Sequence, residues 1–400
     1  MINIALLGFG TVGSGCAEVL MAIKDKIEAQ VGNDIRIKYI LDLRDFPDSP
    51  FADLIIHDFN IILNDPEVTI VAEMMGGSHP AYDFTKALLS AGKSVVTSNK
   101  EVVSTFGIEL LAVAAKNNVR YLFEASVGGG IPIIRPLAND LAANEIVSID
   151  GILNGTTNFI LTKMKNEGAD FGTVLAEAQR LGYAEADPSA DVDGIDAARK
   201  IAILGAMASG RLADPKMIPT EGIRRVTAED TELALEAGYS IKLIGHYDMT
   251  PDGKMALSVS PKFIHNNSPL YAIDDVFNGV LVCGSMMGES LFYGRGAGKR
   301  PTASAVCADI IDAMKNPGAG ALPLRWTADN DIPGANDIKS RLCIITKPGS
   351  DAEKAAVALD AARLVKTSAL SAVFTSAAFA PSDIDEVRHA DGFIKTYSIL

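Results

Sequence analysis

The chain has few cysteines and lacks a long apolar run. Its four cysteines lie neither in a CxxC pair nor at zinc-ligand spacing to a histidine, so we expect no disulfide framework, structural zinc or redox dithiol. No apolar run reaches the roughly 18–20 residues that span a bilayer. The start, MINIALLGFG, lacks the basic region and cleavage site of a signal peptide. We therefore expect a cytoplasmic protein without a membrane partner.

Positive charge is also scarce. The chain has 36 basic and 50 acidic side chains, which gives a net charge of −14. Such a protein is a poor partner for nucleic acid or an anionic membrane surface. Small anionic ligands are not excluded, because local dipoles and single Lys or Arg side chains bind them. With 48% hydrophobic residues over 400 positions, the sequence is that of a globular protein of two or three domains.

The first 125 residues alternate short apolar runs with helical patterns, which is typical of a doubly wound α/β domain with a parallel sheet. The run at 2–7 is followed by apolar positions at helical spacing as far as Ile27. Further strands are expected at 35–41, 68–74, 94–97 and 119–123, and helices at 81–91 and 106–116.

After Gly130 the pattern changes to an α+β arrangement with an open sheet. We expect a helix at 132–143, a strand at 145–153, several helices, strands at 241–247, 255–263 and 276–283, and a helix at 301–314. Residues 318–320 and 329–334 have the composition of linkers. The last 65 residues predict a strand (341–346), a helix (352–364), an apolar run (370–375), a short helix (382–389) and a strand (393–399).

The sequence Gly8-Phe9-Gly10-Thr11-Val12-Gly13 is a GxGxxG motif between a predicted strand and an amphipathic helix. The first glycine permits a tight turn, the second lets a pyrophosphate approach the backbone, and the third lets helix and strand pack closely. The helix N-terminus offers free N–H groups to the phosphates. A plain strand-to-helix turn is the alternative, but this context favours a Rossmann-type dinucleotide site.

The end of the second strand, which often distinguishes NAD from NADP, carries both an acidic and a basic residue. Asp42 would accept a hydrogen bond from the ribose 2′-OH, whereas Arg44 would pair with a 2′-phosphate. Either residue is also compatible with a solvated loop, so the choice between NAD and NADP stays open.

Two lysines are candidates for chemistry. Lys100 ends the run Thr97-Ser98-Asn99-Lys100 after a buried strand, at the edge where open α/β sheets bind ligands, although an ordinary surface lysine fits equally. Asp196 and Lys200 lie at i and i+4 in a stretch rich in carboxylates. Such pairs are usually solvated and weak. Here the following residues are apolar, so we expect the pair to face a cleft, where a lysine can move a proton.

With these residues in view, residues 1 to about 320 resemble homoserine dehydrogenase. The resemblance rests on the GFGTVGSG loop and on the motifs Met75-Gly76-Gly77, Ser98-Asn99-Lys100, Glu124–Pro132, Leu153–Asn158 and Gly182–Lys200. It implies interconversion of L-homoserine and L-aspartate 4-semialdehyde with NAD or NADP, a step toward threonine, methionine and isoleucine. It also implies a homodimer, with residues 1–130 binding the cofactor and 131–320 binding substrate and forming the dimer. The helix near 301–315 would return to the nucleotide domain.

The resemblance also implies roles for single residues. Lys200 would be the catalytic acid/base and Lys100 a second active-site lysine, while Glu185 and Asp196 would hold the amino end of the substrate. The cofactor would be bound by residues of the glycine motif and beyond: Gly8, Phe9, Gly10, Thr11, Val12, Gly13, Arg44, Gly76, Ser98, Lys100, Gly182 and Gly298.

A monovalent cation, usually sodium in this family, is implied at the backbone oxygens of Glu124, Val127, Gly129 and Ile131. A glycine-rich loop can turn several carbonyls inward without side-chain clashes. The alternative is that Gly128–Gly130 is only a hinge between domains.

The C-terminal segment, 335–400, is expected to be a small ACT-like α+β domain, because residues 341–399 roughly follow its βαββαβ order. The usual Pro-Gly-Val-Leu after the first strand is replaced by Lys347-Pro348-Gly349-Ser350, so threonine inhibition stays open.

Two other functions remain as alternatives. One is another NAD(P)-dependent dehydrogenase of amino-acid metabolism, such as aspartate-semialdehyde dehydrogenase, which needs a nucleophilic cysteine that is not evident here. The other is a nucleotide-sensing protein without catalysis, which would not need Lys100, Glu185, Asp196 and Lys200.

Overall fold

The computed structural model describes residues 1–250, 252–318 and 324–400, and they divide into two compact units. Unit 1 comprises Met1–Ala143, Ala206–Asp214 and Gly294–Asp329, and unit 2 comprises Asn144–Gly205, Pro215–Tyr293 and Asn330–Leu400. This division differs from the three predicted domains: the first boundary lies at 143 instead of 130, and 335–400 is part of unit 2 because it shares a sheet with it. The predicted boundary at 320 and most of the predicted linker 318–320 lie outside the described residues.

Unit 1 contains a six-stranded sheet in the order β3-β2-β1-β4-β5-β6, in which all neighbours are parallel. This arrangement confirms the predicted doubly wound α/β domain. All strands except β3, which has two residues, were expected from apolar runs. The strands are β1 (Ile2–Leu7), β2 (Ile35–Leu41), β3 (Ile55–Ile56), β4 (Val68–Glu73), β5 (Ser94–Thr97) and β6 (Tyr121–Leu122).

The helices of unit 1 are α1 (Thr11–Ala22), α2 (Lys24–Val31), α3 (Phe59–Asn64), α4 (Ala81–Ser90), α5 (Lys100–Lys116) and α11 (Lys299–Lys315). The apolar pattern predicted as one helix through Ile27 is broken at Ile23, where the backbone leaves helical geometry. Helix α5 begins six residues before the predicted start, since the Asn99 side chain accepts a hydrogen bond from the N–H of Val102 and caps it.

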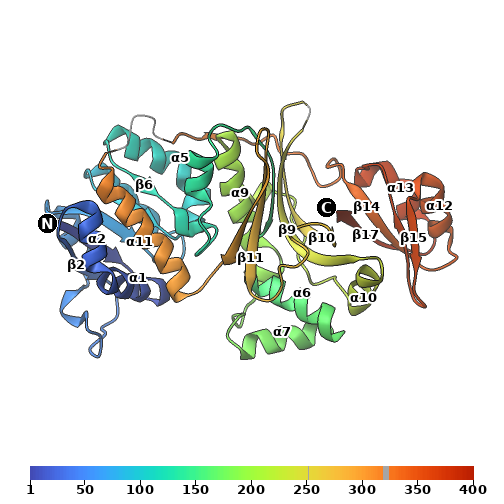
Figure 1. The fold of residues 1–400 in the computed structure, drawn as a ribbon, viewed down its shortest axis with the longest axis horizontal. Coiled ribbons are helices and arrows are strands. Elements are labelled where there is room, and N and C mark those ends of the chain that lie inside the picture. Colours follow the sequence, from blue (N-terminus) through green and yellow to red (C-terminus); the bar gives the residue numbers. More distant parts are fainter. Residues whose placement is uncertain (251, 319–323) are drawn as a thin grey trace. The chain divides into compact units, whose positions relative to one another are not determined.

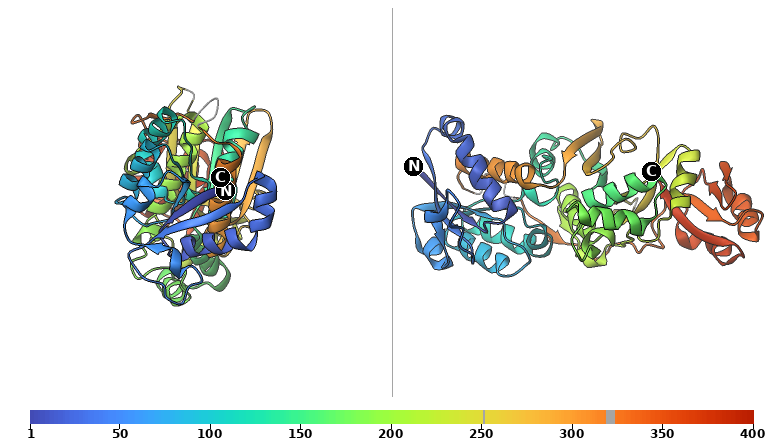
Figure 2. Two further views of the ribbon diagram at one scale, coloured as in Figure 1. Left: turned by 90° about the vertical axis from the view of Figure 1, so that its left-hand side faces the viewer. Right: turned by 90° about the horizontal axis from the view of Figure 1, so that it is seen from below.

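Helix α11 packs against α1, although the two are almost 300 residues apart in the sequence. Figures 1 and 2 show the orange α11 beside the blue α1. The sulfur atoms of Cys16 and Cys307 are 3.6 Å apart between them. This is the helix that was expected to return to the nucleotide-binding domain. Two short parallel strands, β8 (Arg211–Leu212) and β13 (Thr327–Ala328), also belong to unit 1.

The helix predicted at 132–143 is mostly absent. Only residues 134–140 are helical, and Pro136–Asp140 form a π-helical turn. Proline has no N–H, so Pro136 cannot donate the helical i→i−4 hydrogen bond to the carbonyl of Pro132. The prediction from apolar spacing was wrong at this point.

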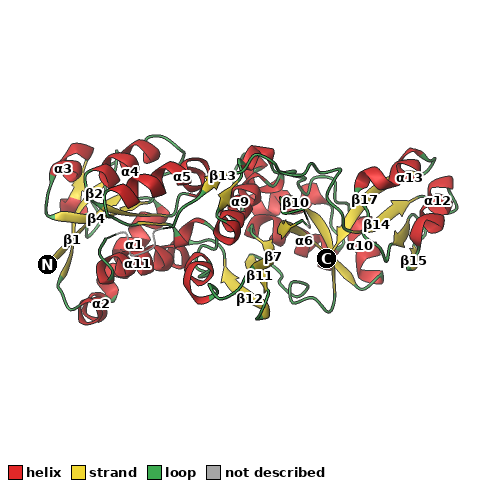
Figure 3. Cartoon of the chain, turned by 90° about the horizontal axis from the view of Figure 1, so that it is seen from above, coloured by secondary structure: helices red, strands yellow, loops and turns green. Residues whose placement is uncertain are grey.

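Unit 2 is built on a nine-stranded mixed sheet in the order β12-β11-β7-β9-β10-β17-β14-β16-β15, shown in yellow in Figure 3. Strand β17 runs parallel to β10 and antiparallel to β14, and so joins the C-terminal strands to the others. Strand β12 was not predicted, because this edge strand has no fully buried residue. The strands are β7 (Ile146–Ile152), β9 (Tyr239–Met249), β10 (Met255–His265), β11 (Phe277–Gly284), β12 (Gly288–Arg295), β14 (Arg341–Thr346), β15 (Arg363–Lys366), β16 (Ser371–Phe374) and β17 (Phe393–Ile399).

The helices of this part are α6 (Gly155–Glu167), α7 (Phe171–Arg180), α8 (Ser189–Val192), α9 (Ile195–Ser209), α10 (Ala228–Glu236), α12 (Asp351–Asp360) and α13 (Asp385–His389). Helix α12 ends before the predicted 364 because residues from Arg363 onward pair with β16 as strand β15. The C-terminal order is β14-α12-β15-β16-α13-β17. Within the described residues, no helix is both long and apolar enough to cross a bilayer.

Candidate active site

The three glycines of the GxGxxG turn have different surroundings. Gly8 adopts a positive φ of 89°, and a Cβ on Gly13 would lie 2.0 Å from the carbonyl oxygen of Gly8. Both positions therefore need glycine to let β1, the turn and α1 pack. A Cβ on Gly10 would meet nothing within 4 Å. Helix α1 begins at Thr11 without a side-chain cap, so no capping side chain occupies its first N–H groups. The turn fits a dinucleotide pyrophosphate.

Asp42 and Arg44, at the end of β2, are paired with each other. The Arg44 guanidinium donates to both carboxylate oxygens of Asp42, at 3.0 and 3.1 Å, and the N–H of Phe9 donates to the same carboxylate at 2.8 Å. Partial burial opposes ionisation of Asp42, but these hydrogen bonds outweigh it and lower its pKa to about 2. The carboxylate is thus tied to the glycine turn, while Arg44 is 64% exposed.

The carboxyl ends of β4 and β5 hold a buried carboxyl group. Glu73 accepts hydrogen bonds from the Thr97 hydroxyl at 2.5 Å and the Met75 N–H at 2.7 Å. Burial raises the pKa of Glu73 to about 7, although both bonds oppose the shift. Asn99 donates to the carbonyl of Gly77 at 2.8 Å. Glu73 and Asn99 thereby fix the Met75–Gly77 loop.

The predicted residues Gly76, Ser98 and Lys100 lie at this edge of the sheet. Gly76 has open space where a Cβ would stand. The N–H of Ser98 donates to the Glu73 carbonyl at 3.3 Å. Lys100 is the first residue of α5 and is half-buried.

The second glycine-rich region of unit 1 consists of two loops in contact. The N–H of Gly130 donates to the carbonyl of Arg295 at 3.0 Å. A Cβ on Gly129, whose φ is 56°, would lie 2.3 Å from the Gly296 oxygen. Gly298, with a φ of 119°, caps α11. Glycine is required here because the two backbones approach too closely for side chains.

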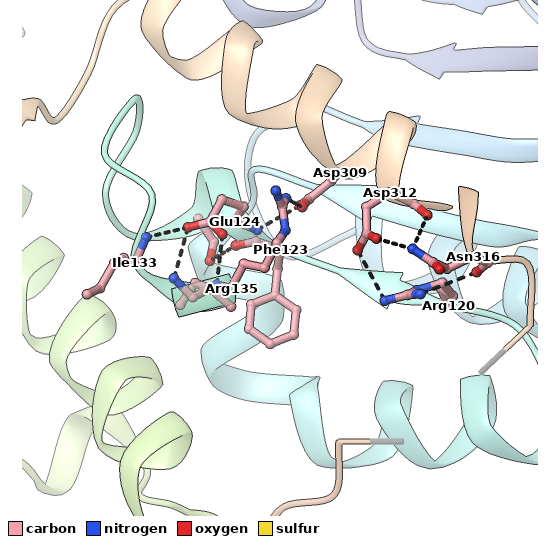
Figure 4. Close-up of polar contacts among 10 residues, drawn as sticks. Arg120, Phe123, Glu124, Ile133, Arg135, Asp309, Asp312 and Asn316 are labelled. Atoms are coloured by element: carbon pink, nitrogen blue, oxygen red, sulfur yellow. Dashed lines mark hydrogen bonds and ion pairs between the residues drawn. The ribbon is translucent and has the colours of Figure 1, made fainter. Parts of the chain in front are cut away.

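Glu124 is buried at the start of the first of these loops. Its carboxylate accepts hydrogen bonds from three successive backbone N–H groups, those of Ile133 (2.6 Å), Ile134 (2.8 Å) and Arg135 (2.8 Å). Figure 4 shows these bonds converging on the two carboxylate oxygens. The side chain therefore closes the loop 124–131 upon itself.

Asp309 of α11 holds the same loop from the other side. It accepts the N–H of Glu124 at 2.8 Å and the Arg135 guanidinium at 2.6 Å (Figure 4). Burial raises the pKa of Asp309 to about 7 against the effect of Arg135. Asp309 could not be predicted from the sequence, because an isolated aspartate inside a helix carries no motif.

In unit 2, Lys200 is buried beside the end of β7. Its ammonium group donates to the Asp196 carboxylate and to the carbonyl of Leu153, both at 2.7 Å. The two side chains are only 9% and 5% exposed. The pair expected on one face of a helix therefore exists and is withdrawn from bulk solvent. An ammonium fixed in place by hydrogen bonds can donate a proton to an oxygen atom brought next to it.

Asn154 joins the pair to a second carboxylate. Its side-chain N–H group donates to Asp191 at 2.7 Å and to Asp196 at 2.9 Å, and its oxygen caps α6 by accepting the N–H of Thr157. Burial, and then the nearby negative charge of Asp196, raise the pKa of Asp191. Asn154 and Asp191 lie within motifs of the sequence, but neither was predicted to have a role. An Asn before a predicted helix was the available signal.

Glu185 and Gly182 lie in the loop after α7, and both are exposed. The carbonyl of Glu185 accepts a hydrogen bond from Gln179 at 3.0 Å. Thr156 donates to the carbonyl of Tyr183 at 2.7 Å, which ties this loop to the start of α6. The predicted substrate residues Glu185 and Asp196 thus lie in the same unit, but Glu185 is exposed whereas Asp196 is buried. Of the other predicted site residues, Lys200 and Gly182 are also in unit 2 and the rest are in unit 1.

Comparisons with known proteins show to which family the chain belongs. Residues 132–311 match the family model of homoserine dehydrogenase, and residues 8–124 match that of the homoserine dehydrogenase NAD binding domain. Homoserine dehydrogenase of Synechocystis sp. is 44% identical over 78% of this chain and 73% of its own length. The Bacillus subtilis enzyme is 42% identical over 79% and 73%.

Solved structures show the same relationship. A homoserine dehydrogenase from Thiobacillus denitrificans superposes with a TM-score of 0.91 at 34% identity, covering 100% of this chain and 98% of the other. A hyperthermophilic archaeal homoserine dehydrogenase, solved in complex with NADPH, has a TM-score of 0.68 at 30% identity and covers 79% of this chain and 99% of the other. With family models over both its nucleotide-binding and its lysine-bearing parts, the chain belongs to the homoserine dehydrogenase family of NAD(P)-dependent oxidoreductases.

Proposed function

We propose that Lys200 is the acid/base of the interconversion of L-aspartate 4-semialdehyde and L-homoserine. The observation that carries this assignment is the buried contact of its ammonium group with Asp196 and the Leu153 carbonyl. Reduction of the aldehyde leaves negative charge on the carbonyl oxygen, which must receive a proton. Lys200 donates that proton, and in the reverse direction it accepts one from the hydroxyl of homoserine. Asp196 keeps Lys200 charged and oriented.

The cofactor, NAD or NADP, supplies or accepts the hydride when it is bound. Its diphosphate would lie over the glycine turn, where Gly10 leaves space and α1 begins without a capping side chain on its first N–H groups. The cofactor-binding set is the predicted one: Gly8–Gly13, Arg44, Gly76, Ser98, Lys100, Gly182 and Gly298. We expect Arg44 to favour NADP, because its exposed guanidinium can leave Asp42 for a 2′-phosphate, whereas Asp42 is already occupied by the Phe9 N–H.

The substrate's amino group would be held by carboxylates. Glu185 is exposed and available for an ammonium ion, and Asp196 lies beside Lys200. Lys100 would act as a helper to Lys200. These roles rest on the resemblance together with the burial and hydrogen bonding of the Asp196–Lys200 pair.

A monovalent cation, sodium above all, would be bound by the main-chain oxygens of Glu124, Val127, Gly129 and Ile131. The loop suits such an ion because its glycines let backbone oxygens turn inward, while the carboxylate of Glu124 is engaged by three N–H groups. A Cβ on Gly128 would lie 2.4 Å from the Ile131 oxygen, so glycine is needed there for the loop to keep this fold. No cluster of His, Cys, Asp and Glu side chains suited to a metal occurs in the described ranges.

The remaining assignments concern the setting of the enzyme. We propose a cytoplasmic homodimer that serves threonine, methionine and isoleucine synthesis. Its C-terminal module, residues 341–399, would be ACT-like, since its elements follow the βαββαβ order.

The test is the oxidation of NADPH or NADH, followed by absorbance, with L-aspartate 4-semialdehyde as substrate. Turnover that yields homoserine would support the proposal. Turnover only in the presence of phosphate and the oxidised cofactor would indicate aspartate-semialdehyde dehydrogenase chemistry, and cofactor binding without turnover would indicate a sensor.

A further inference from the structure

The acidic turn that precedes α9, residues 187–194, is held by a segment far along the chain. Gly222 lies so close to this turn that a Cβ there would be 2.1 Å from the Val192 oxygen and 2.5 Å from the Cα of Asp193. The N–H of Ile223 donates to the carbonyl of Val192 at 2.8 Å. The segment 219–227, called here the strap, thus packs backbone to backbone on the turn.

The side chain of Arg224, in the strap, forms hydrogen bonds with the acidic turn. Its guanidinium donates to both carboxylate oxygens of Asp193 and, at 3.3 Å, to the hydroxyl of Ser189. Bidentate Arg–carboxylate pairs fix orientation as well as distance. Asp191, between these two partners, accepts the Asn154 amide that also binds Asp196. Arg224 is therefore connected to the Lys200 pair by three hydrogen-bonded contacts, Arg224–Asp193, Asp191–Asn154 and Asn154–Asp196, with the backbone of the turn joining Asp193 to Asp191.

The strap is in turn held by the last strand of the protein. Lys395 of β17 donates to the carbonyl of Arg225 at 2.8 Å and to the carboxylate of Asp230 at 2.7 Å. Tyr397 donates its hydroxyl to the same carboxylate at 2.8 Å. Asp230 is 1% exposed and also accepts the N–H of Thr227, so its side chain joins the end of the strap to β17.

The other end of the strap is attached to the central strands. The N–H of Glu221 donates to the Val259 carbonyl of β10 at 2.8 Å. Strand β17 pairs with β10 as well, at Lys262 and Phe263. The strap is thus fixed at both ends, and its middle presents Arg224 to the acidic turn.

We propose that Arg224 is a positioning residue for the substrate half of the active site, and that β17, through Lys395 and Tyr397, holds the strap that carries it. This inference rests on the proposed role of the Asp196–Lys200 pair. The C-terminal segment then contributes to homoserine binding itself, because the acidic turn keeps its place only while the strap is held.

The first experiment compares steady-state kinetics of Arg224→Ala with the wild type. We expect the KM for homoserine to rise about fivefold or more, while the KM for NADP changes less than about twofold, because the cofactor-binding residues of unit 1 are untouched. Arg224→Lys should recover part of the loss, and the exchange Asp193→Arg with Arg224→Asp should recover more. Arg388→Ala is the matched control, since Arg388 forms an exposed ion pair with Asp385 in the same unit.

The second experiment tests the route through β17. The double variant Lys395→Met with Tyr397→Phe should raise the KM for homoserine about threefold, whereas Lys354→Met, which removes an exposed ion pair on α12, should not. Combined with Arg224→Ala, the double variant should add little, because both changes release the same strap.

An unchanged KM for homoserine in Arg224→Ala would overturn the inference, as would equal rises in the KM of homoserine and of NADP. If Arg224→Ala does not fold, Arg224→Lys and the charge exchange give the same comparison. Lys200→Ala tests the proposed function separately from the inference about Arg224. If Lys200→Ala loses kcat while the Arg224 variants keep normal KM values, the proposed function stands and the inference is wrong.

Discussion

At the scale of single residues, the Asp196–Lys200 pair differs from an ordinary i,i+4 ion pair in its burial. Lys163 and Glu167 on α6 have the same spacing but are 26% and 52% exposed, against 9% and 5% for Lys200 and Asp196. An exposed pair contributes little to stability and is accessible to water. A buried one keeps its proton donor in a defined place.

Removing Lys200 should therefore lower kcat. We expect Lys200→Ala to reduce kcat by ~10²–10⁴, with a smaller effect on the KM of the cofactor, because proton transfer acts in the transition state. Lys163→Ala is the matched control and should keep kcat near the wild-type value. Steady-state kinetics in both directions measure kcat for these variants. If Lys200→Ala kept a near-normal kcat while Lys100→Ala lost it, Lys100 would be the acid/base and Lys200 the helper.

Arg44 should determine the preference between the two cofactors. Arg44→Ala is expected to raise the KM for NADPH much more than that for NADH, since only NADPH carries the 2′-phosphate. Arg36→Ala, which removes an exposed arginine from strand β2, should change neither KM. Equal effects of Arg44→Ala on both cofactors would contradict the assignment and leave Asp42 as the better candidate.

At the scale of elements, the β1–α1 turn separates glycines needed for packing from a glycine needed for a ligand. Gly10→Ala places its methyl group in open space, so we expect a folded protein with weakened NADPH binding. Gly13→Ala places its methyl group 2.0 Å from the Gly8 oxygen and should destabilise unit 1. Thermal unfolding and NADPH titration of the two variants measure the difference, and normal NADPH affinity in Gly10→Ala would argue against phosphate binding at this turn.

The loop 124–131 is the element expected to respond to salt. Replacing sodium and potassium by choline at constant ionic strength should lower both activity and the midpoint of thermal unfolding, because the loop's carbonyls would lose their ion. Adding a zinc chelator should change neither. Identical activity and unfolding midpoint in choline and in sodium would exclude the cation site.

At the scale of the whole molecule, stability should depend on the protonation of Glu73. Its pKa is raised from about 4.5 to about 7 by burial, so the folded protein binds this proton more tightly than the unfolded chain. The stabilisation is complete below pH 4.5, is lost as the pH rises through 7, and does not change further above that.

Glu73→Gln should remove this dependence while keeping an acceptor for Thr97. The difference in free energy of unfolding, variant minus wild type, should rise by about 3 kcal/mol between pH 4.5 and pH 8, because the wild type loses the stabilisation from Glu73 over this range. Chemical denaturation at a series of pH values measures this difference. Asp309 also titrates near pH 7, but it is present in both proteins and its effect cancels in the difference. A difference independent of pH would show that Glu73 titrates normally.

Much of the fold could be predicted from the sequence because it depends on local patterns. Continuous apolar runs such as Ile2–Leu7 and Val68–Glu73 are buried strands of a parallel sheet, and the GxGxxG motif lies at the turn it predicts. The i,i+4 spacing placed Asp196 and Lys200 on one face of a helix, and the apolar residues after them indicated burial. In each case, neighbours in the sequence determine the outcome.

Only the tertiary structure shows contacts between distant residues. Asn154 meets Asp191 and Asp196, Asp309 meets Glu124, and β17 reaches Asp230, across separations of 37 to 185 residues. Their residue types carry no signal by themselves, because a polar side chain at an unknown distance has no predictable partner. The predicted helix at 132–143 failed for a different, local reason, because Pro136 has no N–H to donate within a helix, while the distant Glu124 carboxylate binds the N–H groups of Ile133 and Ile134. Periodicity predicts which face of an element is apolar, whereas the chain's path in three dimensions decides which polar groups meet.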